Sequence, residues 1–517
     1  MGELFDQLEE YAQSGAYPFH MPGHKRNAEG AGAFFAEWYK LDVTEIPGMD
    51  DLHAPEGILK EAEERAAALY GADRSFFLVN GSTAGVLAAV SAAVPKGGTI
   101  LMQRASHCSA YHAVMLRELR VHYLYGEQLS MEQLPIKAVE NDLQQFTDKK
   151  DNAMHRAWET VGTGVTAEEV RSALAAHPEA AAVFLTSPTY DGFSSELAAV
   201  AALVHAKGLP LIVDAAHGAH FGMAAYLPQS AVQAGADLVV MSLHKTLPAP
   251  TQTAVLHLSG KRIAAGRVQD FLKIYQTSSP SYLLMAAIDD CIARVSGWKA
   301  EVWQTFYERR RRLSERLHRL RHIRVWDAFG FGALNGAEPD TDSDCSMGGY
   351  GIGIRPEIGK LMVFPAHRGE GAELAEALRQ RGLQCEMVLP AYVLLICTVM
   401  DTEEGYVRLA ETLEYLDTEG EICTSGAAQV GRWQAREAYC RVVQQPFAAK
   451  ADTMGAAAEL PVDEIPLREA AGRISAAQIS VYPPGQPIVV PGECISTAQV
   501  REILALLRNR AAVQGLI

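Results

Sequence analysis

The chain has 517 residues, of which 48% are hydrophobic and 21% are charged, and its formal net charge is -16 at pH 7. This length exceeds what one hydrophobic core usually serves, so we expect two or three domains. The acidic balance repels phosphate backbones and anionic lipid, and no stripe combines basic with aromatic residues, which argues against nucleic acid and membrane surfaces as partners.

The cysteines and the apolar stretches indicate the compartment. The eight cysteines form no CxxC pair, and the opening MGELFDQLEEYAQSG has no basic-then-apolar signal pattern, so we expect a cytoplasmic protein. Apolar stretches such as LAAVSAAV and VLLICTVM are far shorter than the roughly 20 residues that span a bilayer. The sequence therefore predicts no membrane span.

Helical and strand patterns alternate from about residue 60 onward. The sequence predicts a helix in ILKEAEERAAALYGA, a strand at 75–79, an Ala-rich helix and a strand at 99–103. Three further buried strands are predicted at 181–188, 209–218 and 236–245, each with a turn at its carboxyl end. This alternation is typical of an α/β fold with a mostly parallel sheet, in which ligands bind at the carboxyl ends of the strands.

The rest of the chain predicts other parts. Residues 126–165 are polar without a clear period and indicate a surface excursion, whereas 298–323 predicts one long helix whose basic run is a solvated face. The Pro-rich stretch at 481–493 predicts a rigid extended turn. We therefore expect an N-terminal segment at the active site or a dimer contact, a large domain, a small α/β domain and a C-terminal domain, at 1–45, 46–297, 298–420 and 421–517.

Four polar residues lie toward the carboxyl ends of two of the predicted strands: Asp214 in VDAAHG, and Ser242, His244 and Lys245 in VVMSLHKTLPAP. A lysine directly after an apolar strand is partly desolvated, which suits its amine to imine formation. A carboxylate at Asp214 would need a cation, and a protonated pyridine nitrogen is one that makes its ring an electron sink. Singly these residues suit a surface lysine and a helix cap, but on successive strands they predict pyridoxal 5'-phosphate (PLP).

A phosphate cradle is predicted on the same face. Gly81, Ser82, Thr83, Ala84 and Gly85 follow the strand and open an Ala-rich helix. Backbone N–H groups and two hydroxyls would point at an anion there, with the helix dipole behind them. The same junction also suits an ordinary N-cap, and it is not the nucleotide-binding GxxxxGK[ST] loop.

The histidines allow two interpretations. His107 follows an apolar run, where its imidazole suits either a stack on an aromatic ring or a structural role. His217 with His220, and His20 with His24, are clustered in sequence and raise a metal site as an alternative. We expect no metal, because Pro22 and Gly23 break the helix that His20 and His24 would need in order to face the same side. In addition, no carboxylate has the spacing found in zincin metalloproteases.

Several longer strings extend this pattern over nearly the whole chain: PFHMPGHKR (18–26), DVTEIPGMDDLHAPEGILKEAEERAAALYGAD (42–73), FLVNGST (77–83), SPTYDG (187–192), VDAAHGAHF (213–221), SLHKTLPA (242–249), SSPSYLLMAAID (278–289) and VYPPGQPIVVPGE (481–493). In these strings and their order the chain resembles the prokaryotic ornithine/lysine/arginine decarboxylases. That resemblance implies an aspartate-aminotransferase-like, fold type I, PLP enzyme with a mostly parallel central sheet.

The resemblance also implies roles for particular residues. Lys245 would carry PLP as a Schiff base, Asp214 would pair with the pyridine nitrogen, and His107 would stack on the ring. The remaining cofactor contacts, most of them to the phosphate, would come from Ser82, Thr83, Ala84, His217, Ser242 and His244.

Two more residues take roles from the resemblance. Ser279 would contact the cofactor phosphate of a neighbouring subunit, which implies a homodimer or a higher even oligomer. Glu386, in LQCEM, would lie near the distal cationic group of the substrate, because a carboxylate suits an ammonium or guanidinium. A surface charge is the other interpretation of Glu386.

The chain departs from its relatives in two ways. RASHCS places Cys108 where relatives carry a lysine after the histidine, so any role of that lysine is in doubt. The sequence also opens almost directly at the HMPGHK string, without the receiver-like wing domain of the long members, and its excursion at 126–165 looks longer than theirs. We therefore do not expect the large assemblies that the wing domain supports.

The predicted reaction is decarboxylation of a basic amino acid, with arginine or lysine favoured over ornithine. The substrate carboxylate would stand perpendicular to the ring in a water-poor pocket, and Lys245 or His107 would protonate Cα. An aminotransferase or Cα–Cβ lyase is the nearest alternative, although EMVLPAYVLLICT lacks the arginine that aminotransferases usually need. The altered RASHCS segment also allows a non-catalytic, PLP-binding regulatory protein.

Overall fold

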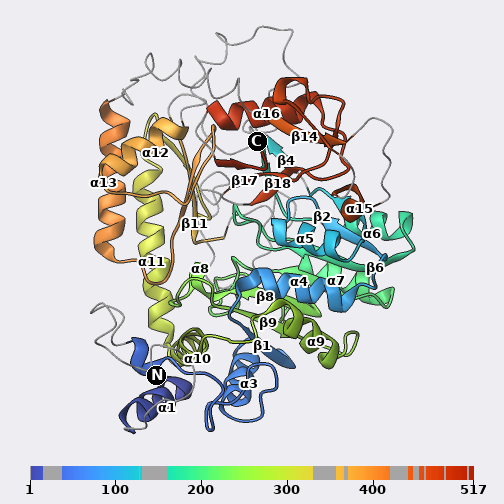
Figure 1. Cartoon of the computed structure of the whole chain (residues 1–517). Helices are drawn as coiled ribbons and strands as arrows, with labels where there is room; N and C mark the ends of the chain where they lie inside the picture. The colour runs from blue at the N-terminus through green and yellow to red at the C-terminus, as the bar shows by residue number, and fades with distance from the viewer. Residues whose placement is uncertain are drawn as a thin grey trace. The chain divides into compact units, whose positions relative to one another are not determined.

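The computed structural model describes residues 2–14, 38–126, 128–130, 160–329, 357–365, 371–419, 441–445, 453–458, 462–482, 485–508 and 512–516. The chain forms two compact units (Figure 1). The first comprises residues 1–102, 170–188 and 197–303, and the second 103–169, 189–196 and 304–517. The HMPGHK string and most of the 126–165 excursion lie outside the described residues, and the boundaries of the four predicted domains stay predictions.

The first unit is built on a mostly parallel sheet, as predicted. Its strands lie in the order β1 (Arg74–Leu78), β9 (Ala254–Leu258), β8 (Leu238–Ser242), β7 (Leu211–Asp214), β6 (Ala180–Thr186) and β2 (Thr99–Gln103). The pairs from β2 to β8 are parallel, and β9 is antiparallel to both of its neighbours. The strands β7 and β8 are buried along their whole length, which explains their continuous apolar sequences.

Helices cover this sheet. Those in the first unit include α1 (Glu3–Gln13), α3 (Ile58–Tyr70), α4 (Gly81–Ala93), α7 (Leu197–Ala206), α8 (Leu243–Thr246), α9 (Ala265–Tyr275) and α10 (Tyr282–Gly297). The helix α4 contacts both β8 and β9 (Figure 1). It approaches closely because Gly85 has no side chain: a Cβ there would lie 2.5 Å from Leu78 Cδ1 and 3.0 Å from Val240 Cγ1.

The second unit contains a four-stranded antiparallel sheet. Its order is β10 (Arg324–Trp326), β11 (Lys360–Phe364), β13 (Val393–Ile396) and β12 (Met387–Val388). The helices α11 (Ala300–Leu317) and α13 (Glu403–Glu419) run side by side in Figure 1 and are joined by the ion pairs Arg312–Glu403 and Arg316–Glu414. The helix α12 (Gly371–Gln380) contacts β12 and β13.

The helix α11 lies within the stretch 298–323 that was predicted as one helix but ends earlier, at Leu317. Its basic run is also not uniformly solvated. Arg311 and Arg312 are paired at the surface with Glu315 and Glu403. Arg310 is fully buried, donates to the Ile358 carbonyl (2.9 Å) and pairs with Asp327. The prediction was wrong for this one position, because consecutive helical residues point in different directions and one of four faces the core.

Two small antiparallel sheets form the C-terminal part of the second unit. One consists of β15 (Asp463–Pro466), β14 (Arg441–Gln445) and β16 (Ile474–Ser475), and the other of β18 (Gln486–Val489), β17 (Ile479–Tyr482) and β19 (Ala512–Gln514). The helix α16 (Thr497–Arg508) and η2 (Leu467–Glu469) contribute to a shared apolar core.

The second unit also includes the segment that follows β2. There the helix α5 (Cys108–Leu116) leads into β3 (Arg120–Leu124), and α15 (Met454–Ala458) packs against α5. The short strands β4 (Gln128–Ser130) and β5 (Thr160–Gly162) pair at the base of the predicted excursion. The helix α6 (Ala167–Ala176) follows, and from residue 170 it belongs to the first unit. None of the helices in the described ranges combines the length and the apolar character that a bilayer span requires.

Candidate active site

The carboxyl ends of β7 and β8 bring three of the predicted residues together. The strand β7 ends at Asp214, and β8 ends at Ser242, directly before the short helix α8 that carries Lys245. The two strands are parallel, with Asp214 opposite Val240. Lys245 Nζ lies 3.1 Å from His217 Nε2, and His217 and Asp214 are both buried. We call Asp214, His217 and Lys245 the strand-end group.

The electrostatics of the strand-end group favour a further cation. Burial raises the pKa of Asp214, while the charge of Lys245 and the Ala216 N–H oppose that rise. The Ala216 N–H donates to Asp214 Oδ1 at 3.1 Å. A buried carboxylate whose ionisation is costly gains most from a positively charged partner. The group therefore suits a protonated heterocyclic nitrogen.

The start of α4 offers the predicted anion site. Asn80 at its N-cap makes no side-chain capping bond, and the first N–H groups of a helix have no intrahelical acceptor. Ser82 is half-buried, Thr83 is exposed and Ala84 is buried. Further along α4, Gly85 packs against Val240 on β8, the strand that leads to α8.

Ser242 and His244 complete the set of polar groups at the end of β8. Ser242 is fully buried, and within the described part of the chain its Oγ has no hydrogen-bond partner. Such a buried hydroxyl calls for an explanation, and a bound ligand is one. His244 donates its Nδ1–H to the Thr253 carbonyl at 2.9 Å, and burial lowers its pKa, which favours the neutral ring.

Ser279 is exposed in the loop before α10. Its N–H donates to Thr277 Oγ1 at 3.2 Å, and the Thr277 N–H donates to Asn80 Oδ1 at 3.1 Å. These bonds tie the loop to the residue that precedes α4 in the same chain. The predicted role of Ser279 in a neighbouring subunit stays a prediction.

In the second unit, His107 is the N-cap of α5. Its Nδ1 accepts the Ser109 N–H at 3.2 Å, and Cys108 Sγ lies 3.6 Å from its Nε2. The Cys108 N–H donates to the Gly485 carbonyl at 2.9 Å. A Cβ on Gly485, whose φ is +80°, would lie 3.0 Å from His107 Nε2. The C-terminal segment thus holds the histidine ring, and the predicted stacking stays a prediction.

Glu386 lies in the same unit, one residue before β12. It is exposed, and its N–H donates to the Leu394 carbonyl at 3.0 Å. Its Oε1 accepts the hydroxyl of Tyr190. Sequence reasoning did not single out Tyr190, although the string SPTYDG contains it. We call these two residues the Tyr190–Glu386 pair.

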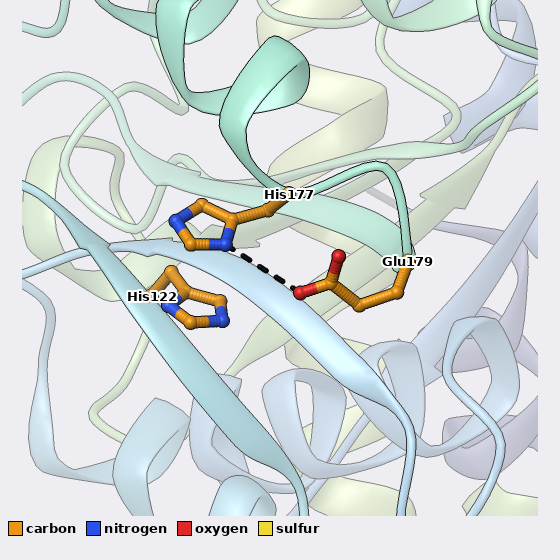
Figure 2. A group of neighbouring side chains, drawn as sticks. All are labelled: His122, His177 and Glu179. Carbon is orange, nitrogen blue, oxygen red and sulfur yellow. Dashed lines mark ion pairs between the residues drawn. The ribbon is translucent and has the colours of Figure 1, made fainter.

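The histidines offered as a metal alternative have other contacts. His217 lies against Lys245, His220 is buried with its ring 4.9 Å from that of Phe221, and the first pair in the sequence, His20 and His24, lies outside the described residues. Figure 2 shows another histidine and carboxylate, His177 and Glu179, whose Nδ1 and Oε1 are 3.5 Å apart. Because Glu179 is exposed, this is an ordinary surface ion pair; His122, also drawn, belongs to the second unit.

Comparison with known proteins gives the same family at the level of family profiles and of sequence relatives, and a solved structure shares the fold. Residues 3–370 match the family profile "Orn/Lys/Arg decarboxylase, major domain", and 433–514 match "Orn/Lys/Arg decarboxylase, C-terminal domain". The uncharacterized protein YaaO of Bacillus subtilis is 34% identical over 99% of this chain and 95% of its own. The arginine decarboxylase of the same organism is 28% identical over 99% and 95%. The Francisella novicida lysine decarboxylase LdcF has a TM-score of 0.75 at 18% identity, covering 100% of this chain and 79% of its own.

Proposed function

Because this chain belongs to the Orn/Lys/Arg decarboxylase family, we propose that it uses PLP, bound through Lys245, to decarboxylate a basic L-amino acid to CO2 and the corresponding amine. The observation that carries the proposal is the strand-end group, in which Lys245 and the buried Asp214 lie at the ends of adjacent parallel strands. Arginine or lysine is favoured over ornithine as the substrate. The similarity to the Bacillus subtilis arginine decarboxylase, which extends over 95% of that protein, supports arginine as the first substrate to test.

The residues at the strand ends fit PLP. The fully buried Ser242 hydroxyl and the uncapped start of α4 are donors of the kind that a phosphate takes. Asp214 is the carboxylate that a pyridinium nitrogen needs. When bound, PLP supplies an electron sink for the charge that the departing carboxylate leaves on Cα.

The chain's own residues would supply binding and proton transfer. His217 Nε2, 3.1 Å from Lys245 Nζ, is placed to accept a proton from the ammonium, so that a free amine is available for attack. Asp214 would hold a proton on the ring nitrogen. Lys245 or His107 would return a proton to Cα after CO2 leaves.

Burial at the strand ends favours loss of CO2. Losing CO2 removes a negative charge from the substrate, so apolar surroundings that exclude water disfavour the starting carboxylate. Asp214, His217 and Ser242 are all buried, in keeping with such surroundings. Because His244 Nδ1–H already donates to Thr253, a phosphate at Nε2 would need a proton there as well, and a phosphate dianion would favour that protonation.

We further propose roles for Glu386 and Ser279. The exposed Glu386 carboxylate would bind the distal ammonium or guanidinium of the substrate. Ser279, also exposed, would contact the cofactor phosphate of a partner subunit, so the enzyme would act as a homodimer or a higher even oligomer, in the cytoplasm.

A substrate panel tests the proposal. Purified protein with PLP is given arginine, lysine or ornithine, and CO2 and the amine product are measured together. We expect equal amounts of both from one basic amino acid, and no turnover by Lys245→Ala. If the protein instead transfers the amino group to a keto acid, it is an aminotransferase and the proposal is wrong. If bound PLP absorbs visible light but no basic amino acid is turned over, the protein is a regulatory protein.

A further inference from the structure

The Tyr190–Glu386 pair joins two distant parts of the sequence within the second unit. The residues are 196 positions apart, and the Tyr190 hydroxyl donates to Glu386 Oε1. A hydrogen bond to an ionised carboxylate is roughly twice as strong as one between neutral groups. The pair therefore fixes one carboxylate oxygen of a side chain that is otherwise exposed.

Glu386 needs such a partner to hold one orientation. Its backbone is fixed by the bond from its N–H to Leu394, but its side chain has three rotatable bonds and is exposed. An unrestrained side chain of this kind loses rotamer freedom when it binds a ligand. With Oε1 held by Tyr190, the carboxylate keeps lone pairs for an incoming cation and loses less entropy when the cation arrives.

Tyr190 is itself held by a tight turn. The Thr189 N–H donates to the Phe193 carbonyl at 2.8 Å, and the Gly192 N–H donates to the Thr189 carbonyl at 2.9 Å. Gly192 has φ of +99°, and a Cβ there would lie 2.5 Å from Lys360 Cγ. Only glycine meets both conditions, so the turn packs directly on Lys360.

A buried cation supports the tyrosine ring. Lys360, on β11, is fully buried, and its Nζ lies 5.3 Å from the centroid of the Tyr190 ring, within the range of a cation–π contact. The neighbouring Asp191 accepts the hydroxyl of the buried Tyr392 at 2.7 Å. The turn is thus anchored after Tyr190, through Gly192 to β11 and through Asp191 to the residue that precedes β13.

We propose that Tyr190 is a specificity-determining positioning residue, which orients the Glu386 carboxylate toward the cationic end of the substrate and is itself held by Lys360. This inference rests on the proposed role of Glu386. It assigns discrimination between charged and neutral side chains to the pair, and leaves the chemistry at Lys245 unchanged.

The test compares a cationic ligand with its neutral isostere on the PLP-loaded enzyme. For an arginine enzyme the pair is arginine and citrulline, and for a lysine enzyme it is lysine and 2-aminoheptanoic acid, in which a methyl group replaces the ammonium. We expect Tyr190→Phe to lower the preference for the cationic ligand about 10-fold, mainly through KM and inhibition constants, with kcat within about twofold. Glu386→Gln should lower it about 100-fold, and the double variant should equal Glu386→Gln because Tyr190 acts through Glu386.

The matched control is Tyr275→Phe, which removes a tyrosine hydroxyl bonded to Ser91 in the first unit and should leave the preference unchanged. The inference is overturned if Tyr190→Phe weakens both ligands equally, or if its effect persists in the Glu386→Gln background. If Glu386→Gln leaves the preference intact, both the role of Glu386 and this inference fall. Decarboxylation of a basic amino acid by the unaltered enzyme is measured in a separate assay. A failure of the proposed function is therefore distinguishable from a failure of this inference.

Discussion

The strand-end group and the Tyr190–Glu386 pair are ordered by different means. Asp214 and His217 are buried, and Asp214 ends a strand that is buried along its length. Glu386 is exposed, precedes a two-residue strand, and is oriented by a tyrosine hydroxyl. Backbone structure thus fixes the group proposed to do the chemistry, whereas side-chain bonds fix the group proposed to choose the substrate. Changes at the first should abolish the reaction, and changes at the second should alter its selectivity.

The largest loss of turnover is expected from a substitution of Asp214. Asp214→Asn keeps the shape of the side chain but removes the charge that would hold a ring nitrogen protonated, so kcat should fall by about 100-fold or more. PLP should still bind, because the lysine and the phosphate donors remain. Turnover and PLP content are measured on the same preparation. Activity near that of the unaltered enzyme would contradict the proposed role of Asp214.

Burial in the first unit should also make the stability of the protein depend on pH, through Glu63. Glu63, on α3, is buried and accepts the Phe77 N–H at 2.9 Å, and burial raises its pKa to about 8. An exposed glutamate titrates near 4.5. Between these two pH values the folded chain holds a proton that the unfolded chain has lost, so the free energy of unfolding falls as pH rises.

Glu63→Gln isolates that effect, because glutamine stays neutral and keeps an acceptor for the Phe77 N–H. Between pH 5 and pH 8 the unaltered protein should lose about 3 to 4 kcal/mol of stability relative to the variant. Denaturant unfolding at several pH values measures the difference. Parallel stability curves for the two proteins would show that Glu63 titrates normally.

The comparison also shows what the sequence predicts and what it does not. Asp214 and Lys245 were predictable because each follows a continuous apolar run, and such runs are local patterns. Tyr190 was not, because its partner is 196 residues away and tyrosine at a turn has no periodic signature. Buried Lys360 and Arg310 were missed for a related reason: their burial depends on elements that pack together only in the folded chain.

Smaller effects are expected from a change at Ser242, which should raise the stability of the protein without PLP and weaken the binding of PLP. Ser242→Ala removes a fully buried hydroxyl that has no partner among the described residues, so the protein without PLP should become about 1 kcal/mol more stable. PLP should bind about 10-fold more weakly, because a phosphate donor is lost. Thermal unfolding and PLP titration by absorbance measure the two quantities. Ser91→Ala, equally buried on α4, should leave PLP affinity unchanged, and unaltered PLP binding by Ser242→Ala would remove Ser242 from the site.

The smallest effect is expected at Tyr392, and it separates support from recognition in the second unit. Its buried hydroxyl donates to Asp191 Oδ1 at 2.7 Å, and burial raises its pKa far enough to keep it a donor. Tyr392→Phe should therefore cost about 1 kcal/mol in stability, seen as a lower midpoint of thermal unfolding, with kcat unchanged. Tyr190→Phe should show the reverse, a changed preference between charged and neutral ligands at nearly unchanged stability, because the Glu386 carboxylate that its hydroxyl binds is exposed to water. If both variants lose stability equally and neither alters ligand preference, the two hydroxyls share one structural role, and recognition of the cationic tail must lie elsewhere in the molecule.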